Sequence, residues 1–201
     1  MNNAAKEILR LRDLLPASWR MRTEVKGGRD QTQVIYSKAI KPWNANTPVY
    51  INFGLWFKLP ESQRDLLFIR EVSWRQTSKW FKLETYQLAT LAAVIFTIPE
   101  VVQFDPAGMS LGFLFTTVAV KQVLKQTKGS KVQIDADNEA IAVAKIRGYS
   151  DTNAARSLLD GIKTVAKLEN RGAPEFVELI RYQNLRALGG LSAVGVSGNL
   201  E

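Results

Sequence analysis

The chain has 201 residues, with 27 Lys and Arg, 19 Asp and Glu, and neither His nor Cys. A chain of this length can bury a full core as one domain, and its hydrophobic fraction of 46% argues against disorder. Without His and Cys, the sequence excludes Ser-His-Asp triads, cysteine nucleophiles, thiol redox pairs, disulfides and zinc sites built from Cys or His.

The net charge of +8 is unevenly distributed along the chain. Residues 1–83 carry 15 basic and 7 acidic side chains, and residues 121–201 carry 12 and 9, whereas residues 84–120 carry no Lys or Arg. A surface that binds nucleic acid gains nothing from so long a stretch without cations. The charge distribution therefore argues against nucleic acid as a partner.

The first 82 residues predict short elements joined by polar loops. The spacing of apolar residues and the positions of Pro and Gly predict a helix that ends near Pro16, a loop over residues 17–31, strands over 33–40 and 49–53, a turn region over 42–48, and a helix over 60–79. This part of the chain therefore mixes helix and strand.

Residues 83–124 predict a hydrophobic helical hairpin. Leu83 to Val102 is long enough to span a bilayer, and the apolar segment from Ala107 to Val120 is slightly shorter. Lysines flank both outer ends and acidic residues lie near the turn, so the positive-inside rule places both ends in the cytoplasm. We therefore expect a membrane protein with cytoplasmic globular parts and the lipid bilayer as a partner. The alternative is a hairpin buried in a soluble core.

The C-terminal third predicts three helices over residues 132–147, 150–168 and 174–188, with Gly148 as the cap of the first. The whole chain then divides into five expected segments. They are an N-terminal helix and basic loop (1–31), strands with a central helix (32–82), the hairpin (83–124), C-terminal helices that complete the core (125–188), and a flexible tail (189–201).

The order of elements over residues 49–74 resembles the approach to the active-site helix of membrane zinc metallopeptidases of the heat-shock and CAAX prenyl-protease type. In that family an edge strand and a Gly-Leu pair lead into a helix with His-Glu-x-x-His, whose imidazoles bind zinc and whose Glu is the general base. The corresponding window here is Arg70-Glu71-Val72-Ser73-Trp74, so both imidazoles are absent.

A later segment extends the same resemblance. Gln133-Ile134-Asp135-Ala136-Asp137, Gly148-Tyr149 and Ala154-Ala155 are similar to the family segment in which a Glu supplies the third zinc ligand and an Asp supports the ligands. The resemblance implies that the degenerate positions of a former metal site are Arg70, Glu71, Trp74, Gln133 and Asp137. It therefore implies no metal, no cofactor, no catalytic residue and no enzymatic activity.

We expect the Arg70 guanidinium to occupy the vacated metal position and to pair with Asp137 or Asp135. Trp74 would fill the remaining volume and exclude water. The alternative is that Arg70 is a solvated charge on an amphipathic helix and that both aspartates belong to an exposed helix start.

The implied fold class is α+β, with a mostly helical zincin-like core and a small antiparallel sheet, interrupted by the hydrophobic, transmembrane helical hairpin. The implied function is that of a catalytically inactive, metallopeptidase-like membrane protein that acts by protein binding, as a scaffold, assembly factor or regulator of a membrane complex. Its partner is an unidentified protein of that complex. The expected binding element is an edge strand that aligns an extended peptide by β-augmentation, formed by Val49, Tyr50, Ile51, Asn52 and Phe53.

The whole chain also resembles an uncharacterised cyanobacterial membrane-protein family. The segments Leu14-Leu15-Pro16-Ala17-Ser18-Trp19-Arg20-Met21 and Glu178-Leu179-Ile180-Arg181-Tyr182-Gln183-Asn184-Leu185-Arg186-Ala187 carry this likeness. It implies a thylakoid or plasma membrane and no assigned activity. Two alternative functions are a soluble, basic nucleic-acid-binding protein and a hydrolase with a non-zinc mechanism.

Overall fold

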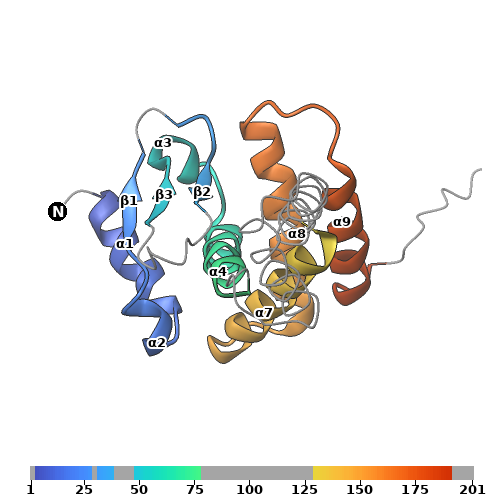
Figure 1. The fold of residues 1–201 in the computed structure, drawn as a ribbon, viewed down its shortest axis with the longest axis horizontal. Coiled ribbons are helices and arrows are strands. Elements are labelled where there is room, and N and C mark those ends of the chain that lie inside the picture. The colour runs from blue at the N-terminus through green and yellow to red at the C-terminus, as the bar shows by residue number, and fades with distance from the viewer. Residues whose placement is uncertain (1–2, 29–30, 39–47, 78–128, 192–201) are drawn as a thin grey trace, which may run out of the picture. The chain divides into compact units, whose positions relative to one another are not determined.

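The computed structural model describes residues 3–28, 31–38, 48–77 and 129–191. The chain divides into two units, residues 1–78 together with 130–201, and residues 79–129. The elements of the first unit are α1 (Asn3–Leu14), α2 (Ala17–Arg20), β1 (Val25–Gly27), β2 (Ile35–Ser37), β3 (Val49–Ile51), α3 (Phe53–Trp56), α4 (Glu61–Thr77), α7 (Ser130–Ile146), α8 (Asp151–Leu168) and α9 (Phe176–Leu188) (Figure 1).

Local sequence signals fix the helix ends. Helix α7 ends in a Schellman motif, in which Gly148 adopts φ +94 and the Tyr149 N–H donates to the Ala144 carbonyl at 3.2 Å. Helix α8 begins two residues later, and the Ser150 hydroxyl caps it by accepting from the Asn153 N–H at 3.2 Å. These two motifs turn the chain tightly between α7 and α8.

The three strands form one mixed sheet in the order β1-β3-β2. Strand β1 pairs with β3 in parallel, Val25 opposite Val49, and β2 pairs with β3 in antiparallel orientation, Ile35 opposite Ile51. The prediction of a small antiparallel sheet is therefore wrong, because the sheet is mixed. Strand β1 has only three residues, one of them a glycine, and it lies in a polar segment that is typical of a loop.

The expected edge strand over residues 49–53 also needs correction. Strand β3 occupies the middle of the sheet, and its backbone is hydrogen-bonded to β1 on one side and to β2 on the other. The strand ends at Ile51, because the Asn52 side chain accepts from the Gly54 and Leu55 N–H groups and starts α3. Residues Val49, Tyr50, Ile51, Asn52 and Phe53 cannot receive an added peptide strand.

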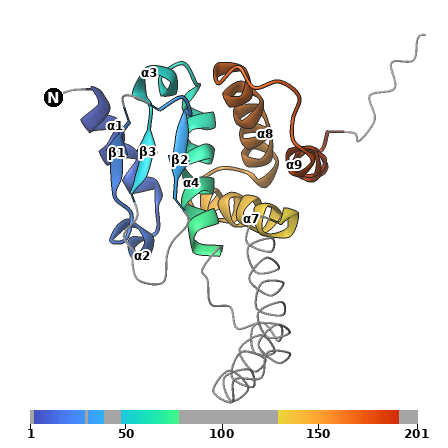
Figure 2. The same ribbon diagram turned by 45° about the horizontal axis from the view of Figure 1, so that its top comes forward.

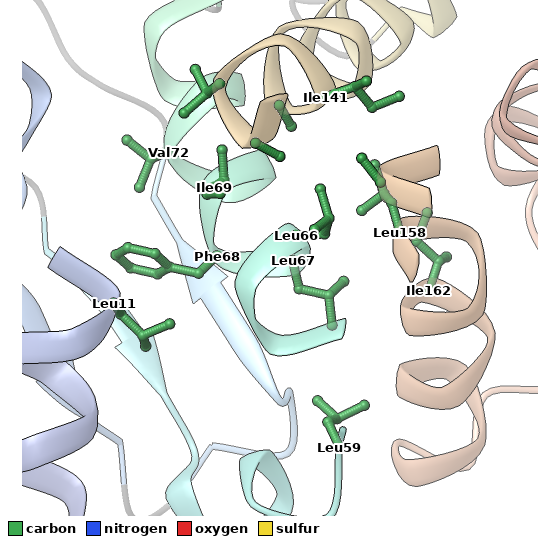
Figure 3. Packing of buried hydrophobic residues seen from close by; sticks show 14 of the residues in the cluster. Leu11, Leu59, Leu66, Leu67, Phe68, Ile69, Val72, Ile141, Leu158 and Ile162 are labelled. Atoms are coloured by element: carbon green, nitrogen blue, oxygen red, sulfur yellow. The ribbon is translucent and has the colours of Figure 1, made fainter. Parts of the chain in front are cut away.

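Helix α4 lies between the sheet and the three C-terminal helices (Figures 1 and 2). In the core, Phe68 of α4 points toward Leu11 of α1, while Leu66 points toward Leu158 of α8 (Figure 3). Gly161 of α8 lets that helix approach α4 closely, since a Cβ there would lie 3.1 Å from the Leu67 side chain. The core is thus arranged around α4.

The prediction of a membrane protein also needs correction. Across the described ranges, no helix combines the length and the apolar character that crossing a membrane requires. The expected hairpin (83–124), all but the last residue of the expected turn region (42–48) and most of the expected tail (189–201) lie outside the described residues. The observed fold is mostly helical with a small mixed sheet. Because none of the described helices could cross a membrane, the membrane localisation is not supported.

Candidate functional site

Arg70 of α4 lies in a cluster of polar side chains, as the expected pairing requires. Its Nε is 3.3 Å from Asp137 Oδ1 of α7 and its Nη1 is 3.3 Å from Glu71 Oε2. It also donates a hydrogen bond to Gln133 of α7. Asp135, the alternative partner, is exposed. Four of the five positions singled out from the sequence therefore lie in direct contact, and the fifth, Trp74, lies half-buried one turn further along α4.

Two further residues of this cluster have no counterpart in the sequence prediction. Arg181 of α9 donates from Nε to Asp137 Oδ2 and from Nη2 to Oδ1, both at 2.8 Å, in a bidentate geometry. The Ser37 hydroxyl at the end of β2 donates to Glu71 Oε1 at 2.6 Å. No local motif connects Arg181 to residue 137 across 44 positions, so only the packing of α9 on α7 reveals the pair.

The electrostatics of this cluster are those of an internally neutralised network. Asp137 is completely buried and faces two guanidinium groups. Burial and the repulsion of Arg181 lower the pKa of Arg70, while the charges of Asp137 and Glu71 raise it. The carboxylates of Asp137 and Glu71 pair with the guanidinium groups of Arg70 and Arg181. Together with the hydrogen bond from Ser37, these contacts hold α4, α7, α9 and β2 together.

A metal ion does not fit this donor set. The described residues nowhere bring three His, Cys, Asp or Glu side chains together as a metal-binding group. In the cluster itself, Arg70 and Arg181 occupy the positions around Asp137 that a cation would need. The side chains therefore act as ion-pair partners of one another.

A second buried network lies at the other end of α4. Glu7 of α1 accepts from Arg10 Nε at 2.9 Å, from Arg64 Nη1 at 2.5 Å and from Trp56 Nε1 at 3.1 Å. Burial pushes the pKa of Glu7 up, but the hydrogen bonds from Arg10 and Trp56 and the charges of Arg10 and Arg64 outweigh it, so the net pKa lies below its ordinary value. This network attaches α1 to α3 and α4.

Arg10 extends the network to Asp65, which it contacts at 2.7 Å, and the Tyr149 hydroxyl donates to Asp65 at 2.9 Å. Burial, followed by the hydrogen bond to Asp65 and the charge of Asp65, together raise the pKa of Tyr149 to about 12. The folded state therefore binds the phenolic proton more tightly than the unfolded chain, in which Tyr titrates near pH 10.

The Tyr149 contribution to stability is expected to be complete below about pH 10 and lost as the pH rises toward about 12. At pH 8, Tyr149→Phe should lower the free energy of unfolding by about 1 kcal/mol, the usual worth of one hydrogen bond. The difference between wild type and variant should then shrink at pH 11.5 in urea denaturation. A difference that stays constant with pH contradicts the raised pKa.

An open groove of about 780 Å³ lies beside the sheet. Helix α1, the end of β1 and the turn into α3 form its walls, and small and aromatic residues line it: Ala4, Ala5, Ile8, Gly27, Gly28, Asn52, Phe53, Gly54 and Phe57. Phe53 and Phe57 pack against each other with ring centroids 5.7 Å apart, and the Arg64 guanidinium lies 5.7 Å from the centre of the Phe57 ring. Sequence analysis missed this groove because its walls are far apart in sequence.

The groove adjoins the outer edge of β1. The Glu24 carbonyl accepts from the Val49 N–H at 2.8 Å, and the Gly28 N–H donates to the Ile51 carbonyl at 3.0 Å. In a parallel ladder alternate residues bond to the neighbouring strand, so residues 24, 26 and 28 face β3. Val25 and Gly27 therefore direct their N–H and C=O groups to the outer side, where no strand of the described sheet lies.

Comparison with known proteins gives one match. A family described as "Protein of unknown function (DUF3318)" matches residues 9–149, which is most of the chain. No curated protein and no solved structure matches. The resemblances to zinc metallopeptidases and to a membrane-protein family are therefore not supported. The prediction that residues 70, 71, 74, 133 and 137 are positions of a former metal site rested on the first of these resemblances and stays untested.

Proposed function

Because the chain belongs to the DUF3318 family, whose description assigns no activity, we propose a function from the geometry: the protein binds an extended segment of a partner protein along the outer edge of β1. The observation that carries this proposal is the outer edge of β1, which lies beside the groove and pairs with no strand among the described residues. Its role in the cell would be that of a scaffold, assembly factor or regulator.

The chemistry of the β1 edge suits the addition of a strand. Outward-facing N–H and C=O groups at Val25 and Gly27 offer main-chain hydrogen bonds, which supply affinity in β-augmentation, and a neighbouring pocket supplies specificity. Gly27 is exposed and Val25 is half-buried, so a peptide backbone can approach without moving a bulky side chain. The binding needs no catalytic residue and no metal.

The charge network around Glu7 supports a binding role for the groove by holding its walls in place. Glu7 anchors α1 through Arg10 and Arg64, and it accepts from Trp56 at the end of α3. A groove whose walls are fixed before binding loses little entropy when its ligand arrives. The proposed site is therefore largely formed in the free protein.

Selection of 12-residue peptides from a random library against the whole protein tests the proposal. Hydrogen exchange of the complex with a selected peptide should be slowed at the amides of Val25 and Gly27, and unchanged in α8. N-methylation of the peptide amide that bonds to β1 should weaken binding by about 2- to 10-fold, whereas methylation of the next, solvent-facing amide should have no effect. Binders that protect other parts of the protein, or steep salt-dependent binding to nucleic acid in their place, would contradict the proposal.

A further inference from the structure

We infer that the segment bound along β1 carries an aromatic residue opposite Gly27, flanked by acidic residues. This inference rests on the proposed binding at the β1 edge and names the chemistry of the partner segment. Three observations carry it: the missing side chain at Gly27, the aromatic wall behind it, and the charge of the residues beside the groove.

The first observation is the open space over Gly27. A Cβ at this position would lie 3.5 Å from two carbons of the Phe53 ring, so the missing side chain leaves space beside that ring. In paired strands, side chains directly opposite one another share a face of the sheet, with Cβ atoms about 5 Å apart. A large ring opposite a glycine fills the missing volume and covers the backbone, as aromatic residues do across from edge glycines.

The second observation is the size and lining of the groove. Phe53 and Phe57 form one wall and Ala4, Ala5 and Ile8 of α1 contribute another. The volume of about 780 Å³ accommodates one aromatic side chain together with part of the backbone that bears it. Of all side chains, an aromatic ring would gain the most binding free energy in such a site, because it can stack against Phe53 and bury a large apolar area.

The third observation is charge. The exposed charged residues next in sequence to the groove lining are all basic: Lys6, Lys26 and Lys58. The acidic neighbour, Glu7, is buried and paired with Arg10 and Arg64. Lys26 also lies 3.2 Å from Glu24, which offsets part of its charge, so Lys6 and Lys58 supply most of the positive field beside the groove. Acidic residues on either side of the aromatic anchor complement this field.

A peptide library that is random at every position tests the inference through the sequences it selects. We expect an aromatic residue at the position opposite Gly27 and Asp or Glu within two or three residues of it. In fluorescence polarisation with the full chain, replacing the peptide's aromatic residue by Ala should weaken binding at least about tenfold. This change leaves the protein itself untouched.

Two protein variants with one matched control complete the experiment. Gly27→Ala places its methyl group at ordinary contact distance from Phe53, so the fold is kept while the space for the ring is reduced, and binding should fall about tenfold. Lys6→Glu with Lys58→Glu should weaken binding by about 3- to 10-fold, and by less at high salt. Lys131→Glu with Lys163→Glu, the same charge change at exposed sites on α7 and α8, should have no effect.

The outcomes separate this inference from the proposed function. Selected peptides that protect the amide of Gly27 but show no aromatic or acidic preference overturn the inference and leave strand addition standing. Peptides that bind without protecting β1, or a library that yields no binder, contradict strand addition itself.

Discussion

Asp137→Ala is expected to lower the free energy of unfolding by about 3–5 kcal/mol, since it leaves two buried guanidinium groups without their shared carboxylate. Asp137 is completely buried and accepts from Arg70 at 3.3 Å and from Arg181 at 2.8 Å. Removing one member of a buried charge network lowers the free energy of unfolding by more than the intact network adds to it, because water cannot reach and solvate the remaining charges. Urea denaturation followed by circular dichroism measures the difference.

Asp135→Ala is the matched control for Asp137→Ala. Asp135 lies on the same helix two residues earlier, but its side chain is exposed, so its removal should change the free energy of unfolding by less than about 0.5 kcal/mol. Equal effects of the two replacements would show that Asp137 contributes no more than a surface carboxylate, contrary to the geometry of the cluster.

Glu7→Gln is expected to lower the free energy of unfolding by about 2–4 kcal/mol. The amide keeps the shape of Glu7 but removes the negative charge that faces Arg10 and Arg64. Glu24→Gln, which removes an exposed charge 3.2 Å from Lys26, is the control and should cost less than about 1 kcal/mol. Since Glu7 also positions a wall of the groove, Glu7→Gln should weaken peptide binding as well.

The effect of Glu7→Gln should depend on pH. The pKa of Glu7 in the folded protein lies below its ordinary value of 4.5, so its charged form contributes stability that is complete above pH 4.5 and is lost as the pH falls through the folded pKa. The difference between wild type and Glu7→Gln should therefore be constant from pH 6 to 8 and smaller at pH 3. A difference that grows on acidification would contradict the lowered pKa.

The helices were predictable because their signals are local. Apolar periodicity, the Ser150 cap and Gly148 placed α4, α7 and α8 within a few residues of their observed bounds, and those predictions are confirmed. The contact between Arg70 and Asp137 was also predicted, although the family resemblance that led to it is not supported. The pairing follows more simply from two buried, opposite charges on helices that pack together.

The parts that were not predictable depend on contacts distant in sequence. Strand β1 has a glycine and an exposed lysine among three residues, and only its pairing with β3 makes it a strand. The central position of β3 follows from that same pairing, which is why the expected edge was placed on the wrong strand. Arg181 reaches Asp137 only after α9 has packed on α7, so no spacing rule could assign it.

The position of α4 in the middle of the core has a consequence for the order in which the protein can fold. The partners of α4 lie on both sides of it in sequence: Arg64 bonds to Glu7, 57 residues earlier, and Arg70 bonds to Asp137, 67 residues later. The Val34 N–H bonds to Glu169 across 135 residues. During synthesis, the sides of α4 and the sheet that pack on α7, α8 and α9 therefore cannot make these contacts until the three helices have left the ribosome. With so many long-range contacts, folding should be slow for a largely helical protein, and the unfinished chain should be the state most exposed to chaperones and proteases.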